Sequence, residues 1–374
     1  MVSSALYTQH HKRVLLGMSG GIDSSVSAML LKEKGFSIIG MTFRSYDTIS
    51  KACMEKETGC CSVNSIFEAK NLANDFGFPH YILDSRDLFE STVIADFISQ
   101  YMTGFTPNPC VLCNKIIKWG KMLEECDKHN CDFIATGHYA QIACENGRYF
   151  LKKAADKSKD QSYFLWTLTQ DNLKRTIFPL GAITKPQVRD IARQNNYRKL
   201  AEKRESQEIC FIPNDDYRSF LREKVPNINQ KISEGNFVDI NGKILGKHKG
   251  FPFYTIGQRK GLEIALGYPA YVLNINANTN TITLGKREDL LRHELWIGNI
   301  NLMKYQNLAP DIDFTCKIRY NNDGEKCKVQ QVGDRIKIEF KNPVSAITPG
   351  QSAVIYEGDD MVAGGIILQN NTNE

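Results

Sequence analysis

Three cysteines stand where a thiol could do chemistry. Cys110 and Cys113 follow a proline-stiffened run, Thr106-Pro107-Asn108-Pro109, and a helix is expected from Lys115 onward. A thiol near a helix N-terminus has a lowered pKa, so more of it is the thiolate that acts as a nucleophile or a metal ligand. The spacing also suits half of a structural zinc site, but the sequence lacks a second pair at that spacing. Nucleophilic thiols are therefore favoured over zinc ligands here.

Cys210, the third cysteine, has two interpretations from its neighbours. Ile209 and Phe211 are apolar, which suits a buried cysteine within a strand. A reactive thiol at the same position would need an exposed site instead. Taken alone, these neighbours favour the buried cysteine.

A glycine-rich run, Gly17-Met18-Ser19-Gly20-Gly21-Ile22-Asp23-Ser24, lies between an expected strand and an expected helix. Small residues let backbone N–H groups close on phosphate oxygens, and a helix N-terminus favours the same negative charge. The run is neither a Walker loop nor the dinucleotide fingerprint. It resembles the pyrophosphate-binding loop (PP-loop) of the ATP pyrophosphatases, and the alternative is a turn without a ligand. The resemblance implies that Asp23 helps to hold Mg²⁺, a cation that suits carboxylate and phosphate oxygens.

Strands alternating with helices are expected to position these residues. Apolar runs predict strands at 14–18, 36–43, 81–83 and 133–135, and helical spacing predicts helices at 23–34, 64–76 and 87–102. This alternation predicts an α/β fold with a doubly wound parallel sheet. Ligands of such sheets bind at the carboxyl ends of the strands, where Ser19, Phe43, Gly137 and His138 fall.

The pattern changes after about residue 213. A short helix is expected at 216–223, followed by glycine- and lysine-rich turns. From Tyr271 onward, short alternating runs at 271–275, 281–284, 314–318, 335–340 and 353–356 predict a small β-barrel. We therefore predict a catalytic domain over 1–212, a small basic central domain over 213–270 and a C-terminal β-barrel domain over 271–374.

Composition and charge narrow the class of protein. The 374 residues are 42% hydrophobic and 24% charged, as in ordinary globular proteins. No apolar run is long enough for a membrane helix and the first residues lack a secretory pattern, so no membrane partner is expected. The 11 cysteines do not form a disulfide-scaffold pattern, which favours a reducing cytoplasm.

Residues 152–260 carry 22 Lys and Arg against 12 Asp and Glu, a net charge of +10. Such a concentration is typical of proteins that bind a polyanion, although a solvated basic surface is the alternative.

Several longer motifs extend the resemblance over nearly the whole chain. Taken together they resemble the tRNA-specific 2-thiouridylase family, whose members thiolate the wobble uridine of tRNA. The motifs are the run 17–24, Thr106-Pro107-Asn108-Pro109, Cys113-Asn114-Lys115, Ala135-Thr136-Gly137-His138-Tyr139, Lys159-Asp160-Gln161-Ser162-Tyr163-Phe164-Leu165, Ile209-Cys210-Phe211-Ile212, Ile256-Gly257-Gln258-Arg259-Lys260-Gly261-Leu262, Arg319-Tyr320 and Thr348-Pro349-Gly350-Gln351-Ser352-Ala353-Val354.

The resemblance implies a reaction in which ATP adenylates uracil O2 and a persulfide sulfur then attacks C2. By this resemblance Cys210 carries the persulfide, and Cys113 is the nucleophile that releases the sulfur or forms a transient disulfide with Cys210. ATP contacts are implied at Gly17 to Ser24, Phe43 and Gly137, and target-base contacts at Asn108, Pro109 and Cys110. tRNA contacts are implied at His138, Lys159, Asp160, Gln161, Arg319, Tyr320 and Gln351. The implied partners are tRNA and an upstream sulfur-donor protein of a persulfide relay.

One position departs from the family pattern, which has Asp where this chain has Cys110. Three thiols, Cys110, Cys113 and Cys210, could then hold a [4Fe–4S] cluster with one open iron. Cluster-free persulfide transfer, which needs only Cys113 and Cys210, is the favoured hypothesis. The remaining alternatives are another PP-loop ligase, either amide-forming or lysidine-type, and a non-catalytic RNA-binding protein.

Overall fold

The computed structural model describes residues 12–46, 63–203, 209–212, 214, 216–309 and 312–369. The chain divides into two compact units. The first comprises Met1–Val93, Cys110–Asp215 and Asp359–Val362, and the second Ile94–Pro109, Asp216–Gly358 and Ala363–Glu374. The glycine-rich run and all three cysteines of interest belong to the first unit.

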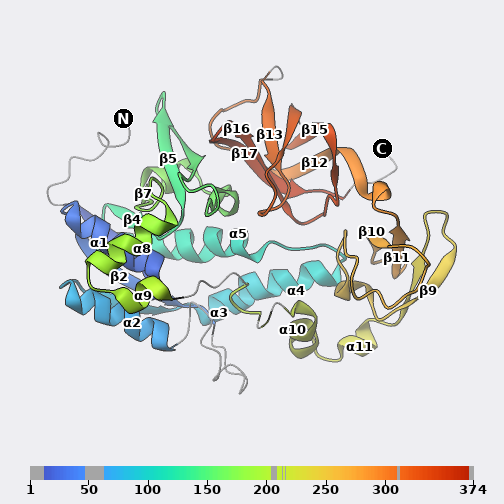
Figure 1. The fold of residues 1–374 in the computed structure, drawn as a ribbon, viewed down its shortest axis with the longest axis horizontal. Helices are drawn as coiled ribbons and strands as arrows, with labels where there is room; N and C mark the ends of the chain where they lie inside the picture. The colour runs from blue at the N-terminus through green and yellow to red at the C-terminus, as the bar shows by residue number, and fades with distance from the viewer. Residues whose placement is uncertain are drawn as a thin grey trace. The chain divides into compact units, whose positions relative to one another are not determined.

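A parallel sheet forms the centre of the first unit (Figure 1). Its strand order is β3-β2-β1-β4-β7, with bounds β1 (Arg13–Gly17), β2 (Ser37–Arg44), β3 (His80–Asp84), β4 (Phe133–Ala135) and β7 (Thr176–Ile177). All four neighbouring pairs are parallel. The predicted α/β parallel-sheet fold is thereby confirmed.

Helices cover the sheet because successive strand residues point to opposite faces. Val14 and Leu16 of β1 share a hydrophobic cluster with residues of α1 (Ile22–Glu33), α2 (Val63–Asp75) and α8 (Lys185–Gln194). Helix α6 (Met122–Lys128) contacts β1 and β4. The helix predicted at 87–102 forms as three consecutive pieces, α3 (Arg86–Phe89), the π-helix η1 (Glu90–Ile94) and α4 (Ala95–Met102).

Four strands of the second unit form a separate sheet in the order β10-β11-β8-β9. They are β8 (Gly235–Val238), β9 (Ile244–His248), β10 (Tyr271–Asn276) and β11 (Thr281–Gly285). The sequence placed 271–275 and 281–284 in the barrel domain, but β11 pairs with β8 and β10 pairs with β11. Alternation predicts that a strand exists and cannot name its partner, since pairing depends on residues distant in sequence.

Six further strands close the predicted barrel. The order is β12-β15-β14-β13-β16-β17, and β12 also pairs with β17. The strands are β12 (Leu291–Leu302), β13 (Phe314–Lys317), β14 (Glu325–Val332), β15 (Arg335–Ser345), β16 (Ser352–Glu357) and β17 (Asp360–Ile367). Alternating side chains fill the interior, as Ile336, Ile338 and Phe340 of β15 show by their burial.

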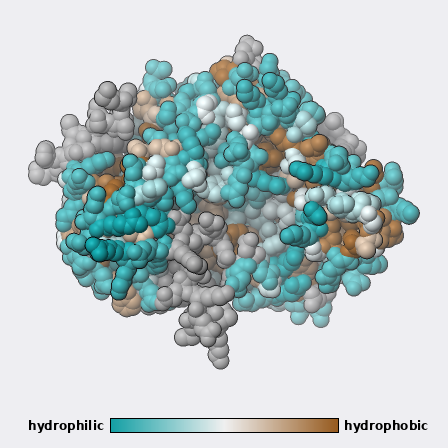
Figure 2. Space-filling view, in the orientation of Figure 1, coloured by the Kyte–Doolittle hydropathy of each residue, from teal (hydrophilic) through white to brown (hydrophobic). Residues whose placement is uncertain are grey.

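Hydrophilic residues cover most of the face drawn in Figure 2, and apolar patches are scattered over it. Among the described residues no helix is both long and apolar enough to cross a bilayer.

Candidate active site

The glycine-rich loop connects β1 to α1, as predicted. The Met18 N–H donates to the Met41 carbonyl at 2.8 Å, and the Thr42 hydroxyl donates to the Met18 carbonyl at 2.8 Å. Both bonds tie the start of the loop to β2. Further along, the Ser24 hydroxyl donates to the Gly21 carbonyl at 3.0 Å and accepts from the Ser19 N–H at 3.2 Å. The loop is therefore held in shape by its own hydrogen bonds.

Two glycines allow backbones to approach closely around this loop. Gly20 has φ +71°, and a Cβ there would lie 2.1 Å from the Ser65 carbonyl oxygen. Gly137, at the end of β4, lies against α1: a Cβ there would meet the Asp23 carbonyl carbon and the Ser24 nitrogen at 2.9 Å. Any other residue at either position would push the loop or the helix away.

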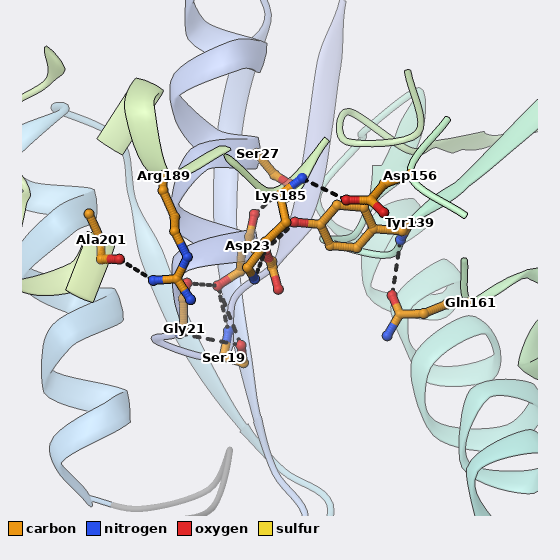
Figure 3. A network of polar contacts seen from close by, with 11 residues as sticks. Ser19, Gly21, Asp23, Ser27, Tyr139, Asp156, Gln161, Lys185, Arg189 and Ala201 are labelled. Carbon is orange, nitrogen blue, oxygen red and sulfur yellow. Dashed lines mark hydrogen bonds and ion pairs between the residues drawn. The ribbon is translucent and has the colours of Figure 1, made fainter. Parts of the chain in front are cut away.

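A buried lysine holds the acidic residue of the loop (Figure 3). The Lys185 ammonium donates to Asp23 Oδ1 at 2.7 Å, and the Tyr139 hydroxyl donates to the same oxygen at 2.7 Å. The Lys185 side chain is 7% exposed and that of Asp23 is 33% exposed. The ammonium also lies 5.6 Å from the centre of the Tyr139 ring. Asp23 lies in the first turn of α1 and Lys185 is the first residue of α8, so both helix N-termini converge here.

This arrangement bears on the Mg²⁺ predicted at Asp23. One carboxylate oxygen already accepts from an ammonium and a phenol, a set that suits charge neutralisation better than metal ligation. Within the described ranges no group of three or more His, Cys, Asp or Glu could hold a metal ion. As the residues stand, Asp23 fits Lys185 rather than a cation, and Cys110, Cys113 and Cys210 do not form a ligand set.

Cys113 lies where an α-helix passes into a π-helix. Helix α5 (Pro109–Cys113) begins directly at the proline-stiffened run, and η2 (Asn114–Lys121) follows it. Cys110 and Cys113 are both half-buried. Cys113 is the last residue of α5, four residues after Pro109. The Asn114 amide donates to the Phe164 carbonyl at 3.0 Å and anchors the turn that follows the thiol.

Cys210 is exposed on a turn, which contradicts the interpretation as a buried strand residue. The Ile212 N–H donates to the Ile209 carbonyl at 2.9 Å and closes this turn. Phe211 is buried and packs edge-on against Phe89, with ring centres 5.6 Å apart. The apolar neighbours that suggested burial therefore anchor the turn, and they leave the Cys210 thiol accessible.

A lysine–histidine pair links the π-helix to β4. The Lys118 ammonium lies 3.3 Å from His138 Nε2, and His138 Nδ1 lies 2.8 Å from the Thr136 hydroxyl. Burial, and then the Lys118 charge, hold the pKa of His138 well below its usual range. The neutral ring therefore accepts from Lys118 through Nε2 and donates from Nδ1 to Thr136.

The residues implied to contact tRNA have different surroundings. Asp160 is buried, and its Oδ1 accepts from the Ala154 and Ser162 N–H groups at 3.0 and 3.2 Å. Gln161 accepts from the Tyr139 N–H at 2.9 Å, and Lys159 is half-buried. Through these bonds, the side chains of Asp160 and Gln161 hold the backbone next to Tyr139 in its conformation.

The other implied contacts belong to the second unit. Arg319 is exposed and Tyr320 half-buried, with the Lys317 ammonium 5.9 Å from the Tyr320 ring centre. Gln351 donates to the Thr106 and Pro107 carbonyls at 3.1 and 2.7 Å. Asn108 is half-buried and Pro109 is buried. In the first unit, Phe43 is half-buried at the end of β2.

Sequence reasoning missed Lys185 as a site residue. One signal was available: Thr184-Lys185-Pro186-Gln187 is a capping-box pattern with proline in the first turn of a helix. In the structure Gln187 Oε1 accepts from the Thr184 N–H at 2.7 Å, and α8 begins at Lys185. The pattern predicts a helix start, but only the tertiary fold brings that start to Asp23.

Three family models match the chain in succession. They are described as tRNA methyl transferase HUP domain over residues 12–214, tRNA methyl transferase PRC-barrel domain over 218–286, and Aminomethyltransferase beta-barrel domain over 292–367. These descriptions mention methyl transfer, whereas the full-length relatives carry another name. The relatives match nearly the whole chain, whereas each family model matches one part of it.

Two such relatives are both named tRNA-specific 2-thiouridylase MnmA. That of Amoebophilus asiaticus is 50% identical over 356 residues, covering 95% of each chain, and that of Cytophaga hutchinsonii is 49% identical, covering 95% of this chain and 97% of its own. A solved U34-tRNA thiolase NcsA from Methanococcus maripaludis with its [4Fe-4S] cluster is 20% identical, with a TM-score of 0.34 over 59% of this chain and 68% of its own. That likeness is too weak to bear on the thiols of this chain. The two long matches at about half identity show that the chain belongs to the tRNA-specific 2-thiouridylase family.

Proposed function

We propose that this chain is a tRNA sulfurtransferase that replaces the 2-oxygen of the wobble uridine by sulfur at the expense of ATP. The observation that carries the proposal is that one folded unit holds the glycine-rich loop together with the half-buried Cys113 and the exposed Cys210. A ligase that joins an amine to an acid would need the loop but not the thiols. An RNA-binding protein would need neither.

The phosphate loop supports the adenylation half of the reaction. Uracil O2 attacks the α-phosphorus of ATP, the bond to the β-phosphate oxygen breaks, and pyrophosphate leaves. Backbone N–H groups at the start of α1 and the ammonium of Lys185 supply positive charge to the phosphates. In this proposal Lys185 turns from Asp23 toward the phosphate oxygens when ATP binds.

The thiols support the sulfur-transfer half. The terminal sulfur of a Cys210 persulfide attacks C2, the C2–O bond breaks and AMP leaves with its electron pair. The Cys113 thiolate then attacks Cys210 Sγ, which breaks the sulfur–sulfur bond and leaves the outer sulfur on C2 as the 2-thiouridine. The product is a Cys113–Cys210 disulfide, which a cytoplasmic dithiol reduces for the next turnover. The sulfur itself comes from a partner protein that carries a persulfide.

The test is thiolation of a tRNA transcript in vitro, read by mass spectrometry of its nucleosides. Cys210→Ser should abolish 2-thiouridine yet still release pyrophosphate, with the AMP group kept on uracil O2, because adenylation does not use the thiol. Cys144→Ser is a matched control, since Cys144 is a half-buried thiol of the same unit on β5 (Ala140–Glu145). Full activity in Cys210→Ser would instead favour another PP-loop ligase.

Cys110 separates persulfide transfer from the cluster alternative. Under persulfide transfer, Cys110→Asp should retain most activity, because the thiol only lines the site. Under the cluster route, both Cys110→Asp and Cys110→Ser should lose bound iron and activity. Iron and sulfide are quantified in anaerobically purified protein. About four irons per chain, lost on Cys110→Ser, would overturn the persulfide mechanism.

A further inference from the structure

Two cysteines that the proposed reaction does not use, Cys126 and Cys131, lie together where α6 ends and the chain turns into β4. Helix α6 ends at Lys128 and β4 begins at Phe133. Cys126 is fully buried, and Cys131 is 6% exposed. The pair lies before the amino end of β4, whereas Gly137 and the glycine-rich loop follow the carboxyl ends of β4 and β1. The two thiols are therefore at the end of the sheet opposite to the candidate active site.

The end of α6 has the backbone hydrogen bonds of a Schellman motif. The Cys131 N–H donates to the Cys126 carbonyl at 2.8 Å, and the Asn130 N–H donates to the Asp127 carbonyl at 3.0 Å. Asn130 has φ +50°, the left-handed conformation that this motif requires. The two residues joined by the longer of these turns commonly bring their side chains into contact. The local backbone thus pairs Cys126 with Cys131.

The two thiols of this pair are chemically unequal. The Cys126 S–H is shared between the Cys131 carbonyl, at 3.1 Å, and the Cys131 sulfur. This hydrogen bond lowers the pKa of Cys131 in spite of burial, and the charges of Arg13 and Arg175 lower it further. The same hydrogen bond, and then burial, raise the pKa of Cys126. Cys131 is therefore the thiol that more readily becomes a thiolate, the reactive form of cysteine.

Arg175 holds the pair from the side that faces solvent. Its Nη2 donates to the Cys126 sulfur at 3.2 Å, to the Cys131 carbonyl at 3.4 Å and to Asp127 Oδ1 at 2.6 Å. The Arg175 side chain is 33% exposed and that of Asp127 is 65% exposed. Small solutes can therefore approach Cys131 past these two side chains, while Cys126 stays behind it.

We propose that Cys126 and Cys131 form a redox-active thiol pair, which a small peroxide oxidises to a disulfide. The Cys131 thiolate attacks one oxygen of hydrogen peroxide, the O–O bond breaks, and the departing oxygen leaves as water after taking up a proton. Cys131 is then a sulfenic acid. The Cys126 sulfur attacks the Cys131 sulfur, the S–O bond breaks and a second water leaves. The two thiols lose two electrons, and the peroxide gains them.

The test treats the reduced full chain with hydrogen peroxide, alkylates the remaining thiols and analyses tryptic peptides without reduction. Trypsin cleaves after Lys128, between the two cysteines, so the disulfide joins peptide 122–128 to peptide 129–148. Cys316 is the matched control, because burial raises its pKa well above the usual range. The link should form at least about 10-fold faster than Cys316 is oxidised, and dithiothreitol should remove it.

Three variants assign the link to its sulfurs. Peptide 129–148 also contains Cys144, so Cys144→Ser should form the link as the native chain does. Cys131→Ser should abolish it and leave Cys126 as a thiol. Cys126→Ser keeps a hydrogen-bond donor beside Cys131 but has no second thiol to attack, so Cys131 should accumulate as a sulfenic acid that dimedone traps.

Thermal melting of the reduced variants checks that they fold, and the Cys144→Ser chain tests the link without altering the buried pair. The proposal would be overturned if this chain formed no link under peroxide that oxidises the exposed Cys210. It would also be overturned if the link survived in Cys131→Ser, or if dimedone labelled Cys126 in that variant. Thiolation of tRNA does not enter any of these measurements, so their outcome leaves the proposed function unaffected.

Discussion

At the scale of single residues, the contact between Lys185 and Asp23 has the largest consequences. Burying an ammonium is costly unless a carboxylate is held against it, and Asp23 meets that need at 2.7 Å. The same pair lies at the start of α1, where phosphates are expected. Lys185 neutralises Asp23, and in the proposed reaction it also binds phosphate when ATP is present.

Lys185→Met should lower both stability and nucleotide affinity. Removing one partner of a buried pair leaves an uncompensated charge, but Asp23 is one-third exposed, so we expect a loss of about 1–3 kcal/mol. Urea denaturation gives the stability, and calorimetric titration of ATP without tRNA gives the affinity. The control is Lys121→Met, which breaks the exposed Lys121–Glu124 pair and should cost less than about 1 kcal/mol. Equal effects of the two variants would contradict the role given to Lys185.

His138 predicts a pH dependence of stability. Its folded pKa is lowered by burial and by Lys118, so below the ordinary pKa of about 6.5 the unfolded chain binds a proton that the folded chain refuses. The contribution of His138 is complete above pH about 6.5 and is lost as the pH falls, with a slope of up to about 1.4 kcal/mol per pH unit.

His138→Gln should flatten this slope, because the amide cannot titrate. The free energy of unfolding is measured between pH 5 and about 7.5 in both proteins. His80 and His248 also have lowered pKa values because they are buried, so some slope will remain in the variant. Identical slopes in the two proteins would show that His138 does not stay neutral in the fold.

At the scale of elements, the loop between β1 and α1 depends on one glycine more than on its neighbour. Gly20 has a positive φ and faces the Ser65 carbonyl, whereas a Cβ on Gly21 would come no closer than 3.5 Å to the Ser19 hydroxyl. Gly21 also has φ −89°, which any residue adopts. The two adjacent glycines therefore form a natural pair of test and control.

Gly20→Ala should destabilise the protein by more than about 2 kcal/mol and weaken ATP binding, since it adds both strain and a clash. Gly21→Ala should change stability by less than about 1 kcal/mol. Thermal unfolding and ATP titration of both variants provide the comparison. If Gly20→Ala binds ATP like the native chain, the loop does not need this backbone shape.

At the scale of the whole molecule, the charge of +10 over residues 152–260 predicts how tRNA binds. Lysines and arginines that meet phosphates release counterions, so affinity falls steeply with salt. With four or more such contacts we expect a loss of about 100-fold between about 50 and about 200 mM salt. ATP binding, measured over the same range, should change far less. A flat response of tRNA affinity would show that the basic segment is only a solvated surface.

The sequence by itself determined the elements whose signals are local. The strand–loop–helix at 13–33 follows from apolar runs and glycines, and the parallel sheet follows from the alternation of strands and helices. The sequence could therefore predict the glycine-rich loop, the position of Gly137 after a strand, and the position of Cys110 and Cys113 near a helix start. Each of these features depends on neighbours a few residues away.

Only the tertiary structure decided what depends on distant residues. Lys185 and Asp23 are 162 positions apart and meet because α1 and α8 pack on the same face of the sheet. Strands β10 and β11 joined β8 and β9 rather than the barrel, since alternation does not specify a partner. The exposure of Cys210 also depends on the tertiary structure. Its apolar neighbours predicted burial, but Phe211 and Ile212 are the buried residues and the Cys210 thiol is exposed. Whether a side chain is buried depends on all the elements that pack around it, so its neighbours in the sequence cannot determine it.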